Sequence, residues 1–159
     1  MPASLPTLAR ALLFGTGVEI YLHPGQLEAT RAPVQLGTLL GSCVAVCLWA
    51  EGEGGGMNHY VLPYGGPSGD LSGKHGPRAI QALLQRLDAL GLPAKRLTAK
   101  VFGGASPLCN SPLGRANAEL ALRLLSEARI PVVAQDVGGT RGRRIAFNPR
   151  TGAVLVRML

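Results

Sequence analysis

Residues 43–63 read CVAVCLWAEGEGGGMNHYVLP, and this stretch decides how the chain is expected to fold. Its first eight residues form a continuous apolar run, which is typical of a strand covered on both faces. The glycine-rich segment 51–56 breaks the run, and extended character resumes over residues 56–63. The stretch therefore predicts two neighbouring strands that pair as a β-hairpin.

Further strands and two helices are predicted on either side of this hairpin. Apolar or alternating runs bounded by Gly and Pro predict strands at 18–23, 97–102, 131–137, 143–148 and 153–158. Pro77, followed by leucines at helical spacing up to Gly91, predicts one helix, and residues 113–128 predict a second. About seven strands and two helices without strict alternation favour a layered α/β or α+β domain with substantial antiparallel pairing.

The size and charge of the chain limit the classes of function to consider. The 159 residues suffice for one ordinary core, and no apolar stretch reaches the roughly 20 residues of a membrane helix. Without a recognisable signal peptide, the protein is expected to be soluble and cytoplasmic, with no membrane insertion. The net charge of +7 favours an acidic protein partner, whereas the 4% aromatic content offers little for stacking on nucleic acid bases.

The cysteines and histidines favour a free thiol over a disulfide scaffold or a metal site. The sequence has an odd number of cysteines, Cys43, Cys47 and Cys109. It has no Cys-x2-Cys pair, and its histidines are scattered, at His23, His59 and His75. We therefore expect a reducing compartment, at least one free thiol, and neither a metal nor another cofactor.

Gly41-Ser42-Cys43 forms a corner at the start of the apolar run, where a thiol could meet a substrate. Amide groups at such a turn can converge on one point and stabilise an oxyanion. His59 lies sixteen residues later on the next predicted strand, and Thr38 lies near enough upstream to supply a hydroxyl. Taken alone, these residues leave two alternatives open: a Cys–His catalytic pair, or a small buried cysteine and a structural histidine.

Four sequence blocks, in order, resemble the CheD family of chemoreceptor glutamine deamidases: TLLGSCVAVCLW, GGMNHYVLP, AKVFGGA and DVGGTRGRRIAFNPRTGAVLV. The likeness runs from about Gly15 to Leu159. It implies a single deamidase domain over 15–159 after an N-terminal extension, residues 1–14. The fold that it implies is a layered α/β/α-type sandwich with a mixed, largely antiparallel sheet and two main helices.

The resemblance also implies roles for three residues. Cys43 corresponds to the nucleophile of the family and His59 to its base. The family often has an assisting threonine six residues before the cysteine; that position is Gly37 here, and Thr38 is the nearby candidate. A nucleophile of this kind is expected to react faster than Cys47 and to titrate below an ordinary thiol, whose pKa is about 8.5.

The implied activity is hydrolysis of glutamine side chains to glutamate in chemoreceptors, through a thioester and with release of ammonia. The implied partners are the cytoplasmic helices of chemoreceptors and the CheC phosphatase. Two alternatives remain open at this point. The chain could be a Cys–His amidase or thioesterase with another substrate, or a non-catalytic adaptor that binds CheC or receptors.

Overall fold

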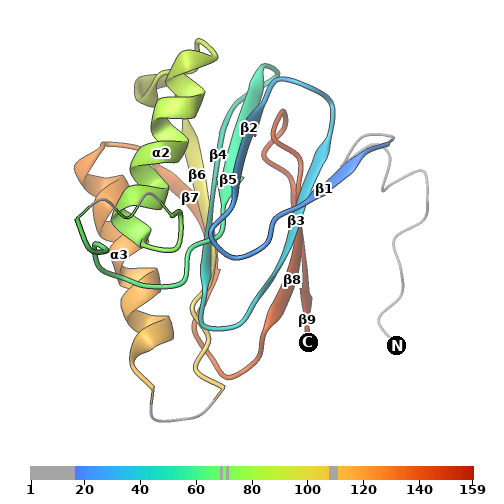
Figure 1. Cartoon of the computed structure of the whole chain (residues 1–159). Coiled ribbons are helices and arrows are strands. Elements are labelled where there is room, and N and C mark those ends of the chain that lie inside the picture. The colour runs from blue at the N-terminus through green and yellow to red at the C-terminus, as the bar shows by residue number, and fades with distance from the viewer. Residues whose placement is uncertain (1–16, 69, 71, 108–110) are drawn as a thin grey trace.

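The computed structural model describes residues 17–68, 70, 72–107 and 111–159, and these residues form three stacked layers. Figure 1 shows two helices on one side, a five-stranded sheet in the middle and a four-stranded sheet on the other side. The predicted N-terminal extension, residues 1–14, and Cys109 lie outside the described residues.

The middle sheet has the strand order β2-β5-β4-β6-β7. Its central strand β4 (Val44–Ala50) pairs antiparallel with β5 (Gly54–Asn58) and with β6 (Thr98–Gly103). At the edges, β2 (Leu27–Thr30) pairs antiparallel with β5, and β7 (Val132–Val137) pairs parallel with β6. Every residue of β4 is buried, and the predicted hairpin of β4 and β5 is confirmed.

The outer sheet has the strand order β1-β3-β8-β9. Strand β1 (Glu19–Tyr21) pairs parallel with β3 (Gln35–Leu40), and β3 pairs antiparallel with β8 (Arg143–Phe147). Strand β8 in turn pairs antiparallel with β9 (Val154–Met158), so both of these predicted strands are confirmed. Because β3 leads directly into β4, the chain crosses from the outer sheet to the middle sheet at residues 41–43.

The helices α2 (Gly76–Ala89) and α3 (Leu113–Glu127) pack on the same side of the middle sheet, and a short 3-10 helix spans Ala94–Arg96. The α+β class, the largely antiparallel pairing and the two main helices are confirmed. A second sheet takes the place of the second helical layer of an α/β/α-type sandwich. Within the described ranges, neither α2 nor α3 combines the length and apolar character needed to cross a bilayer.

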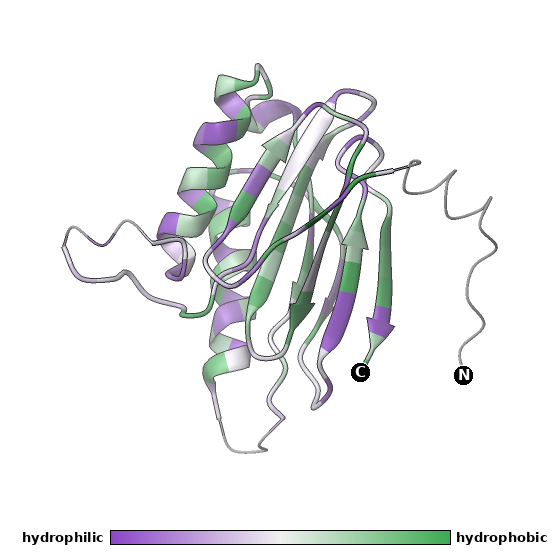
Figure 2. Cartoon of the chain, turned by 45° about the vertical axis from the view of Figure 1, so that its right-hand side comes forward, coloured by the Kyte–Doolittle hydropathy of each residue, from purple (hydrophilic) through white to green (hydrophobic). Residues whose placement is uncertain are grey.

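Alternation along β4 explains why both of its faces are apolar. Val44, Val46 and Leu48 belong to the core between the middle sheet and the helices. Ala45 and Cys47 belong to a second core between the two sheets. Figure 2 shows hydrophobic residues concentrated on strands in the middle of the molecule and hydrophilic residues on the helix surfaces. A strand between two cores reads as a continuous apolar run, as the sequence does.

Two strands, β2 and β3, were not among the elements that the sequence predicts, and β5 begins two residues earlier than expected. The glycines of β5 were interpreted as a break, but they permit close packing instead. A Cβ atom at Gly55 would overlap the carbonyl oxygen of Leu48, and one at Gly56 would overlap that of Glu28. These glycines therefore belong to the strand because neighbouring backbones approach them too closely for a side chain.

Candidate active site

Cys43 lies at the corner where the chain passes from one sheet to the other. It immediately precedes β4, is partly exposed and packs against the core between the sheets. Cys47 is on the same face of β4 but is fully buried in that core. The two thiols are both free, and the full burial of Cys47 identifies it as a packing residue.

The pairing of β4 with the segment after β5 brings His59 towards Cys43. Cys47 is paired with Met57, and Val44 forms an isolated bridge with Tyr60. Counting between these pairs places Ala45 level with His59, so Cys43 is its diagonal neighbour on the same face of the sheet. Pairing within the predicted hairpin therefore brings His59 beside the Cys43 end of the strand.

Thr38 approaches His59 from the opposite sheet. Thr38 is fully buried, and its Oγ1 lies 2.7 Å from His59 Nδ1 and 2.6 Å from the carbonyl oxygen of Leu22. The Leu22 carbonyl can only accept, so it receives the single hydroxyl proton of Thr38. Nδ1 of His59 must then donate to Oγ1, which leaves Nε2 as the unprotonated nitrogen of a neutral ring.

Nε2 of His59 is buried and has no hydrogen-bond partner among the described residues. Burial, opposed by the Leu22 backbone and assisted by the nearby charge of His23, lowers the pKa of His59 to about 4. The ring is therefore neutral at pH 7 and presents a free lone pair. A neutral imidazole held in one tautomer by a hydroxyl can act as a general base.

The low pKa of His59 makes folding stability depend on pH. Between pH 6.5 and about 4 the unfolded chain binds a proton at this residue that the folded protein excludes. We therefore expect the free energy of unfolding to fall as the pH is lowered through this window, by about 3 kcal/mol in total. Urea unfolding of the wild type and of His59→Gln at pH 7 and pH 4 measures this effect. His59→Gln should lack this pH-dependent part of the free energy of unfolding. Equal pH dependence in the two proteins would contradict the assignment to His59.

The thiol of Cys43 does not follow the expectation drawn from the sequence. Burial raises the pKa of Cys43 above its ordinary value, and the residue's own backbone amide opposes this increase only in part. Burial raises the pKa of Cys47 much more, although Lys100 lies nearby. The expected titration of Cys43 below an ordinary thiol was therefore wrong. The resting site therefore holds a neutral thiol and a neutral imidazole.

The corner is anchored through its carbonyl groups, which leaves amide groups free. The amide of Ala105 donates to the Gly41 carbonyl at 3.0 Å, and the amide of Gly104 donates to the Cys43 carbonyl at 2.8 Å. In the described part of the chain, the amides of Ser42 and Cys43 donate to no other residue. These two N–H groups are available to stabilise an oxyanion beside the thiol.

Gly103 supports this corner from the neighbouring strand. Its φ of 109° is unfavourable for other residues, and a Cβ atom there would overlap the carbonyl oxygen of Cys43. We expect Gly103→Ala to lower the free energy of unfolding by about 2 kcal/mol or more and to displace the corner. Urea unfolding measures the first effect. Gly52→Ala is the matched control, because Gly52 also has a positive φ but no atom near the position of its Cβ. Equal losses in the two variants would show that backbone strain alone is responsible.

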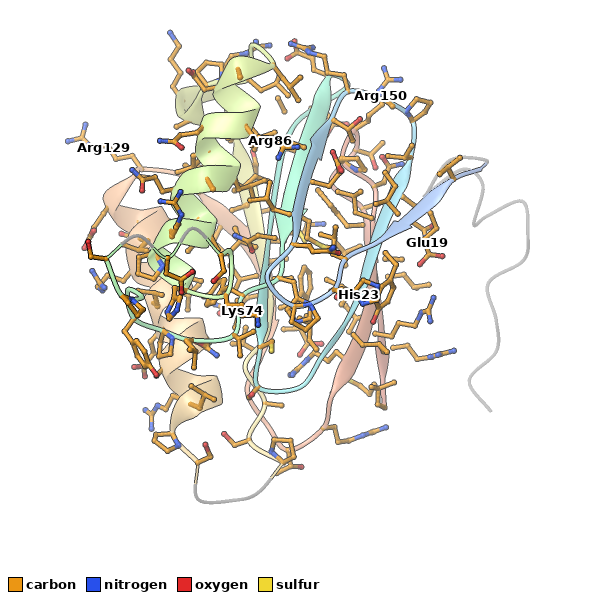
Figure 3. All side chains as sticks on the ribbon, in the orientation of Figure 1. Glu19, His23, Lys74, Arg86, Arg129 and Arg150 are labelled. Atoms are coloured by element: carbon orange, nitrogen blue, oxygen red, sulfur yellow. The ribbon has the colours of Figure 1, made fainter. Side chains whose placement is uncertain are left out.

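A turn and the end of a long loop lie close to the histidine. Gly25 donates its amide hydrogen to the His59 carbonyl at 2.8 Å, and Cγ of Lys74 lies 3.0 Å from the position that a Gly25 Cβ would occupy. Figure 3 shows Lys74 and His23 on the same side of the molecule. Positive charge therefore borders the turn that holds His59. No cluster of three metal-binding side chains occurs in the described ranges.

Asn58 and Asn117 are polar residues near the site whose contacts the sequence did not reveal. Asn58 Oδ1 accepts a hydrogen bond from the amide of Val46 at 2.9 Å, in place of a regular ladder bond. Asn117 is fully buried in the first half of α3. The sequence did contain a signal for these contacts: an amide side chain in an apolar strand, or on the apolar face of a helix, requires a buried hydrogen-bond partner.

The chain is similar to a known protein family and to several curated proteins. A family model described as CheD chemotactic sensory transduction matches residues 61–158. A protein of Trichlorobacter lovleyi is 45% identical over 141 residues, which cover 86% of this chain and 88% of that protein. A protein of Sulfurimonas denitrificans is 43% identical, with 86% and 92% covered. One of Anaeromyxobacter dehalogenans is 44% identical, with 91% and 87% covered. These relatives are named "probable chemoreceptor glutamine deamidase CheD" or "CheD 1". The chain belongs to the CheD family.

Proposed function

We propose that this protein is a chemoreceptor glutamine deamidase that uses Cys43 as nucleophile, His59 as base and Thr38 as the group that orients the base. The observation that carries the proposal is the Thr38–His59 hydrogen bond, which leaves Nε2 of His59 unprotonated on the face of the sheet shared with Cys43. The names of the relatives supply the substrate class.

In the first half of the reaction, the side-chain amide of a receptor glutamine is converted to a thioester. Nε2 of His59 takes the thiol proton while Sγ of Cys43 attacks the amide carbon, and the carbonyl oxygen becomes an oxyanion. The free amides of Ser42 and Cys43 stabilise this charge. Nε2–H then protonates the departing nitrogen, the C–N bond breaks, and ammonia leaves.

In the second half, water replaces the thiol. Nε2 of His59, which is neutral again, takes a proton from water as the oxygen attacks the thioester carbon. The second oxyanion collapses, the C–S bond breaks, and the thiol recovers its proton from His59. The product is a glutamate side chain. The Thr38 hydroxyl accepts from Nδ1 throughout and stabilises the imidazolium less than a carboxylate would.

The charge of the protein supports an acidic receptor surface as the partner. The net charge is +7, and Lys74 lies beside the turn that is bonded to His59. Long-range attraction of this kind increases association rates more than it increases affinity. Chemoreceptor cytoplasmic helices and a CheC phosphatase are the proposed partners, and the cytoplasm is the proposed location.

Incubation of the purified protein with cytoplasmic fragments of cognate chemoreceptors tests the activity, with peptide mass spectrometry to map glutamine-to-glutamate conversion. We expect conversion at a small set of glutamines and equimolar ammonia. Binding of receptor or CheC without conversion would favour the adaptor alternative. Hydrolysis of small amides or thioesters without receptor conversion would favour the alternative of another substrate.

A further inference from the structure

Asn117 of α3 connects the corner that carries Cys43 to the segment that carries His59. Its Nδ2 donates to the carbonyl oxygen of Ser42 at 2.9 Å and to that of Val61 at 2.8 Å. Both neighbours are acceptors, so the amide group must present its nitrogen to them. Oδ1 of Asn117 is buried and has no partner among the described residues, so the donor end of the side chain makes these contacts.

Helix α3 brings this side chain to the corner because the helix packs closely against residues 104 and 105, whose amides hydrogen-bond to the corner. Gly114 packs against the turn at Gly104 and Ala105, where a Cβ atom would overlap the Ala105 carbonyl oxygen. The hydroxyl of Tyr60 donates to the backbone carbonyl of Asn117 at 2.6 Å, which fixes the helix from the middle sheet. Asn117 is therefore placed by packing on one side and by a hydrogen bond on the other.

The bond to Ser42 determines the direction of the Cys43 amide. A trans peptide is planar, so its C=O and N–H groups point in opposite directions. Asn117 holds the Ser42 carbonyl towards the helix layer. The N–H of Cys43, in the same peptide, must then point away from the helices and towards the side of the sheet that carries the thiol. The partly lowering effect of this amide on the Cys43 pKa agrees with that direction.

We propose that Asn117 is a positioning residue that fixes the Ser42–Cys43 peptide so that the Cys43 amide serves as an oxyanion donor. Its second bond, to Val61, holds this donor in register with His59, two residues earlier in the chain. The inference rests on the proposed deamidase function and adds to it the residue that prevents the peptide from flipping. A flipped peptide would present a carbonyl oxygen where the oxyanion forms.

Asn117→Ala removes the two side-chain N–H donors that bind the carbonyls of Ser42 and Val61. We expect it to lower kcat for receptor deamidation by about 10²-fold with little change in KM, because one oxyanion donor, the Cys43 amide, is no longer held in place. A substrate-independent measurement accompanies it: the rate of Cys43 alkylation by iodoacetamide as a function of pH. The midpoint should move to higher pH, because the amide no longer faces the thiol. Asn117→Ser keeps one donor and serves if the alanine variant does not fold. It should show smaller changes in both measurements.

A control variant separates positioning from general stability. Leu125→Ala removes buried packing from the same helix away from the corner. It should lower the urea midpoint of unfolding, while the folded protein keeps the wild-type kcat and alkylation midpoint.

These measurements test the positioning role of Asn117 and the proposed deamidase function independently of each other. A shifted alkylation midpoint in the Asn117 variants alone supports the positioning role even if the wild type deamidates no receptor, a result that would contradict only the proposed function. An unshifted midpoint, or a loss of kcat no greater than in Leu125→Ala, overturns the positioning role even if the wild type is an active deamidase.

Discussion

Cys43→Ala is expected to lower kcat for receptor glutamine deamidation by at least about 10⁴-fold, because no other group can form the thioester. The corner amides and His59 remain in this variant, but they stabilise a tetrahedral intermediate that can now arise only from direct attack by water. Peptide mass spectrometry of a receptor fragment, with time points long enough to detect slow conversion, measures the residual rate.

Cys47→Ala is the matched control for this variant. Cys47 lies on the same face of β4, but it is fully buried and its pKa is strongly raised. Its replacement should reduce stability and leave kcat unchanged. Activity that survives in Cys43→Ala but not in Cys47→Ala would mean that the wrong thiol has been assigned.

His59→Gln is expected to lower kcat by about 10²- to 10⁴-fold, the contribution of a general base and acid. Glutamine is an uncharged polar side chain of similar size, so the variant tests proton transfer more than packing. The wild-type profile of kcat/KM against pH should fall on the acid side near pH 4, where His59 becomes protonated. In the variant, this acid limb should be absent.

His23→Gln provides the control for His59→Gln because His23 is an exposed imidazole whose charge reaches His59. Removing that charge relieves part of the depression of the His59 pKa. The variant should keep its maximal activity, with its acid limb moved to slightly higher pH. Retention of full activity in His59→Gln would overturn the assignment of the base.

The sequence predicted the central hairpin well because the pattern that specifies it is local. A seven-residue buried strand between two cores has no polar residue on either face, and this property can be read directly from the residues of β4. The same property did not reveal what covers each face. Helices and a second sheet both require an apolar surface, so the order of the layers depends on pairings between distant segments, such as β3 with β8.

The assignment of Thr38 depended on one of these distant pairings. Gly37 and Thr38 are adjacent, and a shift of one residue reverses the direction of a side chain in a strand. Strand β3 was not predicted, so there was no strand register from which to decide between the two residues. The pairing of Thr38 with Ile145 across β3 and β8, together with the burial of Leu36 and Leu40, places the threonine between the sheets. The contacts of Asn117 could not be predicted for a similar reason, since its partners are 75 and 56 residues away in the chain.

The crossing of the chain at residues 41–43 has a consequence for how the protein can lose activity. Thr38 lies in a strand of the outer sheet, His59 directly follows β5 of the middle sheet, and Cys43, the proposed nucleophile, lies on the segment that passes from β3 to β4. A slight separation of the two sheets would break the Thr38–His59 bond and let the imidazole change tautomer while every strand pairing stayed intact. Activity therefore depends on the close packing of the two sheets against each other, and loss of activity should precede unfolding when denaturant is added.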